Sequence, residues 1–242
     1  MIKRAVLTGL LTRAGLSAVR AQAPSRGRRV NHAGRTVDLH AGPAGAVASA
    51  IGIGQLKPGV GAAVLVAGAC GAYDDVVGAG DPRRGFRAHL SALRDGEVTS
   101  GAVKLFGVGA AGMFAGALLK ERAVDRLLAG VVVAGTAHFV NLVDVRPGRA
   151  VGAVLVLGVP GLLRGGAARE LSAAAMGAAA AVLPDDLGER SMLGDTGAHA
   201  LGAALGAAIV AGNGRAGLVA HAAAVVGAAV CGSAVSRAAR YA

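Results

Sequence analysis

Residues 101–119 read GAVKLFGVGAAGMFAGALL, an apolar run whose single charged residue, Lys104, lies near its start. An α-helix rises 1.5 Å per residue, so this run extends about 28 Å, close to the hydrocarbon thickness of a bilayer. Glycine and alanine supply more than half of it. Because such small residues let membrane helices pack closely, the run predicts a helix inside a membrane bundle.

Eight further apolar runs follow the same pattern, at about residues 2–19, 42–56, 59–73, 124–141, 150–163, 168–183, 196–211 and 216–235. Hydrophobic residues make up 54% of the 242 residues and charged residues 16%, whereas about 25% of a soluble domain is charged. This composition excludes a disordered chain and a disulfide-stapled secreted domain, and it disfavours a soluble enzyme. We predict an all-α polytopic membrane bundle, one domain over residues 1–242, with about nine transmembrane helices in a range of seven to ten.

The first run has two interpretations. Its basic start, apolar stretch and Ala21-Gln22-Ala23 sequence imitate a secretory signal peptide with a cleavage site. Arg13 interrupts the apolar stretch, however, and cleavage would leave the basic residues that follow on the outer side. We expect an uncleaved first helix.

The net charge of +11 indicates an orientation. Basic residues gather in the segments at about 20–41, 74–100, 142–149 and 184–195, and cytoplasmic loops carry an excess of Lys and Arg. We therefore expect these segments as inner loops, the N-terminus outside and the C-terminus in the cytoplasm. Aromatic residues do not interleave with the basic ones, so we expect no nucleic-acid partner.

The acidic residues indicate a site. Eleven of the 14 fall on the expected inner side, although Asp and Glu contribute little to topology. Three motifs lie where apolar runs meet inner loops: Asp74-Asp75, Asn141-Leu-Val-Asp144 and Gly194-Asp195-Thr-Gly197. Adjacent carboxylates repel each other unless a cation neutralises them or one holds a proton as a general base. Mg²⁺ binds one or two carboxylates together with substrate phosphates, so the motifs predict a shared metal and phosphate site.

Each motif also has a purely structural interpretation. Asp74-Asp75 suits a solvated helix end, and Asn141 with Asp144 suits a helix C-terminus followed by a turn at Pro147. Asp195 suits the N-cap of the next helix. The occurrence of all three motifs on one membrane face favours a shared site.

The motifs, their order and their placement resemble the polyprenyl-phosphate N-acetylhexosamine-1-phosphate transferases. This family includes the phospho-MurNAc-pentapeptide translocase of peptidoglycan synthesis and the UDP-GlcNAc:undecaprenyl-phosphate transferases. The resemblance rests on Asp74-Asp75, on Gly85 to Leu90 and Thr99 to Lys104, on Asn141 to Asp144, and on Leu193 to Gly197. Asn31 to Arg35 is similar to the family's first inner loop, and the resemblance covers roughly residues 25–210.

The resemblance implies an enzyme of the bacterial plasma membrane with its active face in the cytoplasm. Its reaction is the transfer of a sugar-1-phosphate from a UDP-N-acetylhexosamine to undecaprenyl or decaprenyl phosphate, with release of UMP, in cell-envelope glycan synthesis. The implied cofactor is Mg²⁺, with Mn²⁺ as a substitute. The implied partners are the UDP-sugar donor and the polyprenyl phosphate acceptor. A homodimer with a second copy of the chain is an open alternative to a monomer.

The resemblance also assigns roles. Asp195 would bind the metal with support from Asp75, and Asp74 would orient or deprotonate the lipid phosphate. Lys104, Asn141 and Asp144 match positions near the nucleotide and diphosphate, and Asp144 joins Asp74 and Asp75 as a candidate catalytic residue. To these we add three candidate phosphate contacts: Arg146 and Arg149, which also suit membrane anchors, and His89, which also suits a bystander.

Departures from the family pattern leave two other classes open. Pro147-Gly148 stands where the family continues with a second Asp-Gly, and Ala198-His199 replaces its usual Ser-Leu. The family's late inner loop, often His-rich, does not follow the ninth run. A non-catalytic relative that binds polyprenyl phosphate is therefore an alternative. A transporter is a remoter one, since it requires ionisable residues midway through spans, where we find only Arg13 and, less centrally, His138 and His221.

Overall fold

The computed structural model describes residues 1–22, 27–81, 83 and 85–241. Residues 23–26, in the expected inner loop 20–41, and residues 82 and 84, in the expected loop 74–100, lie outside the described part. The predicted all-α fold is confirmed, because the described residues form eleven α-helices with one small two-stranded hairpin.

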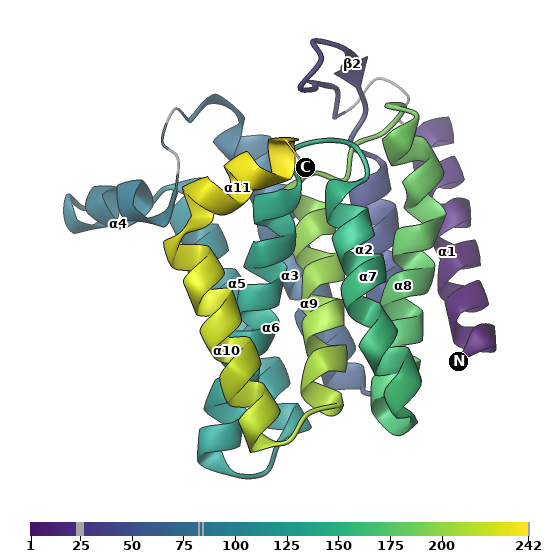
Figure 1. The fold of residues 1–242 in the computed structure, drawn as a ribbon. Coiled ribbons are helices and arrows are strands. Elements are labelled where there is room, and N and C mark those ends of the chain that lie inside the picture. The colour runs from purple at the N-terminus through teal and green to yellow at the C-terminus, as the bar shows by residue number, and fades with distance from the viewer. Residues whose placement is uncertain (23–26, 82, 84, 242) are drawn as a thin grey trace.

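The elements follow one another along the chain as shown in Figure 1. They are α1 (Ile2–Gln22), β1 (Arg29–Val30), β2 (Thr36–Val37), α2 (Ala41–Gly54), α3 (Pro58–Val77), the 3₁₀ turn η1 (Gly78–Gly80), α4 (Phe86–Arg94), α5 (Ser100–Leu119), α6 (Ala123–Val143), α7 (Arg149–Arg164), α8 (Gly166–Leu187), α9 (Gly194–Ala211), α10 (Arg215–Val230) and α11 (Gly232–Tyr241).

Every predicted apolar run falls on a helix, with three differences in detail. The short helix α4 forms inside the expected loop 74–100. Helix α3 extends to Val77, so Asp74 and Asp75 lie in its last turn and not in that loop. The run 216–235 does not form one straight helix, because α10 and α11 are bent by 85° around Cys231. Gly232 begins α11 at this break, and glycine weakens a continuous helix.

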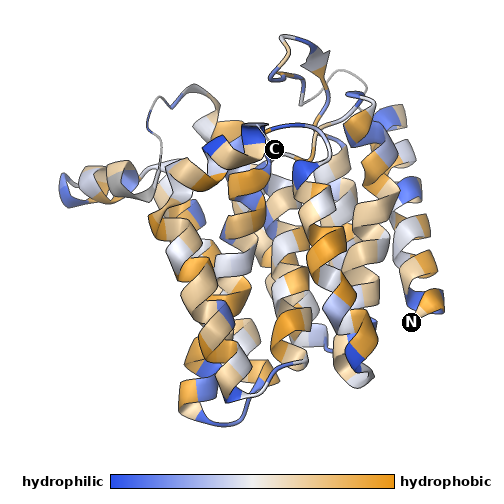
Figure 2. Ribbon diagram, viewed as in Figure 1, coloured by the Kyte–Doolittle hydropathy of each residue, from blue (hydrophilic) through white to orange (hydrophobic). Residues whose placement is uncertain are grey.

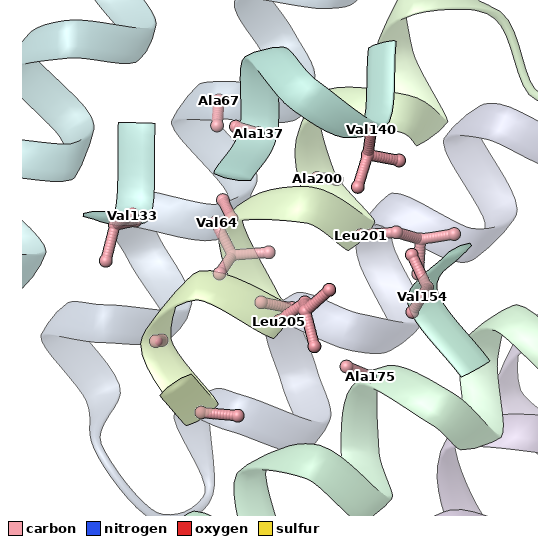
Figure 3. Close-up of a cluster of buried hydrophobic side chains, with 14 of the residues drawn as sticks. Val64, Ala67, Val133, Ala137, Val140, Val154, Ala175, Ala200, Leu201 and Leu205 are labelled. Carbon is pink, nitrogen blue, oxygen red and sulfur yellow. The ribbon is translucent and has the colours of Figure 1, made fainter. Parts of the chain in front are cut away.

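Helix α9 forms the centre of the bundle. It packs against α6, α3, α8 and α2, and nearly all its residues are buried. Figure 3 shows Ala200, Leu201 and Leu205 of α9 among apolar side chains from α3, α6, α7 and α8. A Cβ atom added at Gly202 would lie 2.6 Å from the Cα of Ala137 in α6, so these two backbones touch. The abundant small residues therefore give the bundle its close packing.

Three helices in the described part are long and apolar enough to cross a membrane: α3 with η1 (Pro58–Gly80), α5 and α6. The bent pair α10 and α11 adds a fourth if it is taken as one span. Figure 2 shows apolar residues over much of the helix bodies and hydrophilic residues gathered in the loops at both ends. Phe106 and Phe114 of α5 and Val156 of α7 are exposed, which suits helices that face lipid.

The contact at Gly202 yields a stability prediction. Gly202→Ala should lower the free energy of unfolding by about 1–3 kcal/mol, because the added methyl group forces α9 away from α6. Gly152→Ala in α7 is the matched control, since its methyl group would meet no atom within 4 Å. It should leave stability unchanged or raise it by up to about 1 kcal/mol. Thermal unfolding of both variants in detergent checks this, and equal melting temperatures would contradict the packing.

Candidate functional site

The N-terminus of α9 is capped by a side chain from α3. One carboxylate oxygen of Asp75 accepts a hydrogen bond from the backbone amide of Asp195 at 3.0 Å. The other accepts from the backbone amide of Thr196 at 2.9 Å and from its hydroxyl at 2.6 Å. A negative charge here also suits the positive end of the helix dipole. The capping role that the sequence suggested for Asp195 therefore belongs to Asp75.

A glycine in α3 allows Asp75 to reach the first backbone amides of α9. Gly71 lies one turn before Asp75 in α3, and a Cβ atom there would overlap the backbone carbonyl of Asp195. The backbones of α3 and α9 thus approach as closely as the chain permits. This approach brings the Asp74-Asp75 and Gly194-Asp195 motifs together, as the shared-site prediction requires.

Lys104 joins two of the predicted carboxylates. Its ammonium group, carried by the first turns of α5, donates a hydrogen bond to Asp74 at 2.5 Å and another to Asp195. All three side chains are largely shielded from solvent. Three helices, α3, α5 and α9, therefore place two carboxylates around one cation.

Two cavities meet at this cluster. The larger, of about 770 Å³, has the Asp74, Lys104 and Asp195 cluster in its wall. Farther along, it is lined by apolar residues of α5, α6 and α10: Leu105, Val108, Val131, Val225 and Val226. The smaller cavity, of about 330 Å³, includes Asn31, His32 and Arg146 in its lining. Both cavities share five residues: Arg29, Asp75, Asp144, Val145 and Asp195.

The end of α6 supplies further predicted residues to these cavities. Asn141 lines the larger cavity, and Asp144 lies between the two. Burial, with Asp186, Asp195 and Asp75 nearby, raises the pKa of Asp144 well above its ordinary value. A carboxyl group perturbed in this way inside a cleft is typical of a functional site.

The predicted phosphate contacts differ in position. Arg146 lines the smaller cavity. Arg149 begins α7 and is not among the described residues that line either cavity, so its predicted role gains no support. His89 of α4 lines the larger cavity, and its Nδ1 atom lies 3.0 Å from the hydroxyl of Thr99.

Sequence reasoning missed the roles of the acidic pair Asp185-Asp186 at the end of α8. Asp186 accepts a hydrogen bond from the backbone amide of Gly148 at 2.7 Å, which fixes the loop between α6 and α7. Buried Asp185 forms ion pairs with Arg13, Arg20 and Arg190. The sequence did contain one signal for the role of Asp185: Arg13 lies inside an apolar run, and an arginine there needs an acidic partner.

Arg29 in β1 was also missed. Its guanidinium donates a hydrogen bond to the backbone carbonyl of Asp75, which fixes the short hairpin over the wall shared by both cavities. The sequence offered no signal for this residue, since it is one arginine in a basic segment.

Asp74 and Asp195 are two carboxylates of the cluster that point toward one cationic group. Asp74 and Asp195 already share a cationic group, so their oxygen atoms converge, and Mg²⁺ needs only one or two carboxylates when phosphates complete its shell. No group of three or more His, Cys, Asp or Glu side chains in the described chain is placed to hold a metal. Both Asp75 oxygens accept hydrogen bonds from α9, and its predicted role with Asp195 in binding a metal stays a prediction.

Comparison with protein-family models gave no match, and comparison with curated protein sequences gave none either. The family relationship therefore stays a resemblance in motifs. In the described residues, those motifs lie close together at the wall between the two cavities.

The Asp75 cap yields a second prediction. Asp75→Asn removes the negative charge and leaves one good acceptor for three donors, so the free energy of unfolding should fall by about 1–2 kcal/mol. Asp95→Asn, just beyond α4, is the control and should unfold like the parent protein. Thermal unfolding in detergent distinguishes them, and an Asp75→Asn variant as stable as the control would argue against the cap.

Proposed function

We propose that this protein is a phosphoglycosyltransferase of the bacterial plasma membrane that works in cell-envelope glycan synthesis. It transfers a sugar-1-phosphate from a UDP-N-acetylhexosamine to a polyprenyl phosphate and releases UMP. One observation carries the proposal: a cavity lined in part by apolar residues of α5, α6 and α10 and a smaller cavity with two arginines meet at a wall that contains Asp75, Asp144 and Asp195. A transferase that joins a lipid to a polar donor needs such an arrangement.

The larger cavity suits the lipid acceptor. Its apolar walls on α5, α6 and α10 accommodate an isoprenoid chain, and Lys104 at its polar end offers a positive charge to the phosphate. Asp74 shares the ammonium group of Lys104 and so lies where it can orient the attacking phosphate.

The smaller cavity suits the nucleotide-sugar diphosphate. Arg29 and Arg146 bring two positive charges to a space that is also lined by Asn31 and His32. Five acidic residues line it too, so a diphosphate would need a divalent cation beside it: Asp75, Asp144, Asp186, Glu189 and Asp195. Arginine is well matched to phosphate oxygens, because its planar donors form paired hydrogen bonds. Its shared wall with the larger cavity would bring the β-phosphate of the donor toward the lipid phosphate.

In the proposed reaction an oxygen of the lipid phosphate bonds to the β-phosphorus of the donor. The bond from that phosphorus to the bridging oxygen breaks, and UMP leaves with the electron pair. Such phosphoryl transfer depends mainly on positioning and on charge stabilisation. Asp195 and Asp74 would hold a Mg²⁺ ion, which when bound supplies neutralising charge to the diphosphate. Lys104 would then turn from Asp195 toward a substrate phosphate, and Asp75 would keep the start of α9 in place.

The proposed topology has nine membrane helices: α1, α2, α3, α5, α6, α7, α8, α9 and α10. The N-terminus lies outside, and the Asp74, Asp144 and Asp195 motifs face the cytoplasm. Support comes from the bundle itself, in which eight of these helices contribute described residues to one core and α1 packs against α2 and α8.

A non-catalytic relative that binds polyprenyl phosphate is the second candidate. The specific observation in its favour is the ammonium group of Lys104, which lies between Asp74 and Asp195, where a divalent cation would be held. Such a protein would keep the lipid cavity and use Lys104 to neutralise the carboxylates permanently.

UMP release distinguishes the two candidates. Purified protein in detergent is given undecaprenyl phosphate, Mg²⁺ and a panel of UDP-N-acetylhexosamines. We expect metal-dependent UMP release that falls by at least about 100-fold in Asp195→Asn. Asp125→Asn is the control, because this residue pairs with Arg215 at the opposite end of α6 and should leave the rate unchanged. Binding of polyprenyl phosphate without turnover of any donor would overturn the enzyme and favour the non-catalytic relative.

A further inference from the structure

Helix α11 leaves the direction of the bundle. It follows α10 after the single residue Cys231 and is bent from it by 85°. Figure 1 shows α10 running alongside the bundle and α11 crossing its end. If α10 runs across the bilayer, α11 must lie nearly parallel to the membrane surface. A straight continuation would carry its apolar residues about 15 Å farther, into water.

The sequence of α11, GSAVSRAARY, separates into two faces. At 100° per residue, Ser233, Arg237 and Arg240 share one face of the helix. Ala234, Val235, Ala238, Ala239 and Tyr241 occupy the other. Such a short helix with a basic face and an apolar face has the pattern of helices that lie in a membrane interface.

The protein itself covers little of α11. None of its ten residues is buried, and Tyr241 has 84% of its surface exposed. Its contact with the bundle includes a hydrogen bond from the Ser236 hydroxyl to the backbone carbonyl of Leu142, at 2.7 Å. Among the described residues, Arg237 and Arg240 form no ion pair with a carboxylate, and α11 contains no acidic residue. Its two arginines and the exposed part of its apolar face, Ala234, Ala238 and Tyr241, are therefore available to an external partner.

We propose that α11 is an interfacial helix that binds anionic phospholipids. Arg237 and Arg240 contact the phosphates of lipid headgroups, while Ala234, Ala238 and Tyr241 insert at the boundary between headgroups and acyl chains. The charge of α11 favours an anionic leaflet. Its two arginines share one face and the helix has no carboxylate side chain, so it is complementary to negative headgroups. This role does not depend on catalysis.

Lipid binding by α11 would also affect the larger cavity, because α11 directly follows a helix that lines it. Val225, Val226 and Ala229 of α10 line that cavity just before the bend. A membrane-bound α11 therefore holds one wall of the cavity at the depth of the headgroups. Lipid molecules that enter beside α10 would arrive with their phosphates at the same level.

A single tryptophan tests the proposal, because the chain has none of its own. Ala238→Trp is placed in vesicles of phosphatidylcholine alone or mixed with phosphatidylglycerol, with and without lipids brominated near the headgroup. We expect strong quenching of the tryptophan by brominated lipid, and at least about fivefold tighter association of α11 when phosphatidylglycerol is present. Val219→Trp on α10 is the control, whose quenching should not depend on the anionic lipid.

Arg237→Gln with Arg240→Gln in the Ala238→Trp background should abolish the dependence on phosphatidylglycerol while the Val219→Trp signal stays unchanged. Quenching that is equal in both lipid mixtures would overturn the proposal. A blue-shifted tryptophan that brominated lipid does not quench would also overturn it, because α11 would then be buried against a second protein chain.

Discussion

The contact between the Asp75 carboxylate and the first amides of α9 is the interaction on which the site depends. It joins the end of α3 to the start of the most buried helix, with three hydrogen bonds to two carboxylate oxygens. Because a cap from another helix fixes both partners, Asp195 cannot move without moving Asp75. The cavities on either side of this contact therefore share a wall that is held together by these hydrogen bonds.

Small residues allow the close helix packing from which this contact follows. Gly71 lets α3 reach the backbone of Asp195, and Gly202 lets α9 reach α6. A bundle built on larger side chains would hold these backbones farther apart, and Lys104 could not reach Asp74 and Asp195 together. The glycine content of the chain thus serves packing and site geometry at once. Open space remains where residues of α5, α6 and α10 line the larger cavity.

Much of the fold follows from local sequence. Apolar runs and their breakers predict the helices, because membrane helices satisfy their own backbone hydrogen bonds and need only length and hydropathy. The convergence of Asp74 and Asp195 could be expected once three acidic motifs were placed on one face, whereas Lys104 was expected there only from the family resemblance. The cap by Asp75, the anchoring of Gly148 by Asp186 and the position of Arg29 could not. Each depends on the distance between segments far apart in the chain, which hydropathy does not encode. The bend at Cys231 also escaped prediction, because no proline marks it.

The central claim is that a cation at Asp195 lies against the phosphates of a nucleotide sugar at the wall between the cavities. Mn²⁺ in place of Mg²⁺ allows a direct measurement of the magnetic coupling between the metal and phosphorus nuclei of a bound UDP-sugar. We expect phosphorus coupling in the parent protein and its loss in Asp195→Asn. Bound Mn²⁺ without phosphorus coupling, or coupling that persists in Asp195→Asn, would contradict it.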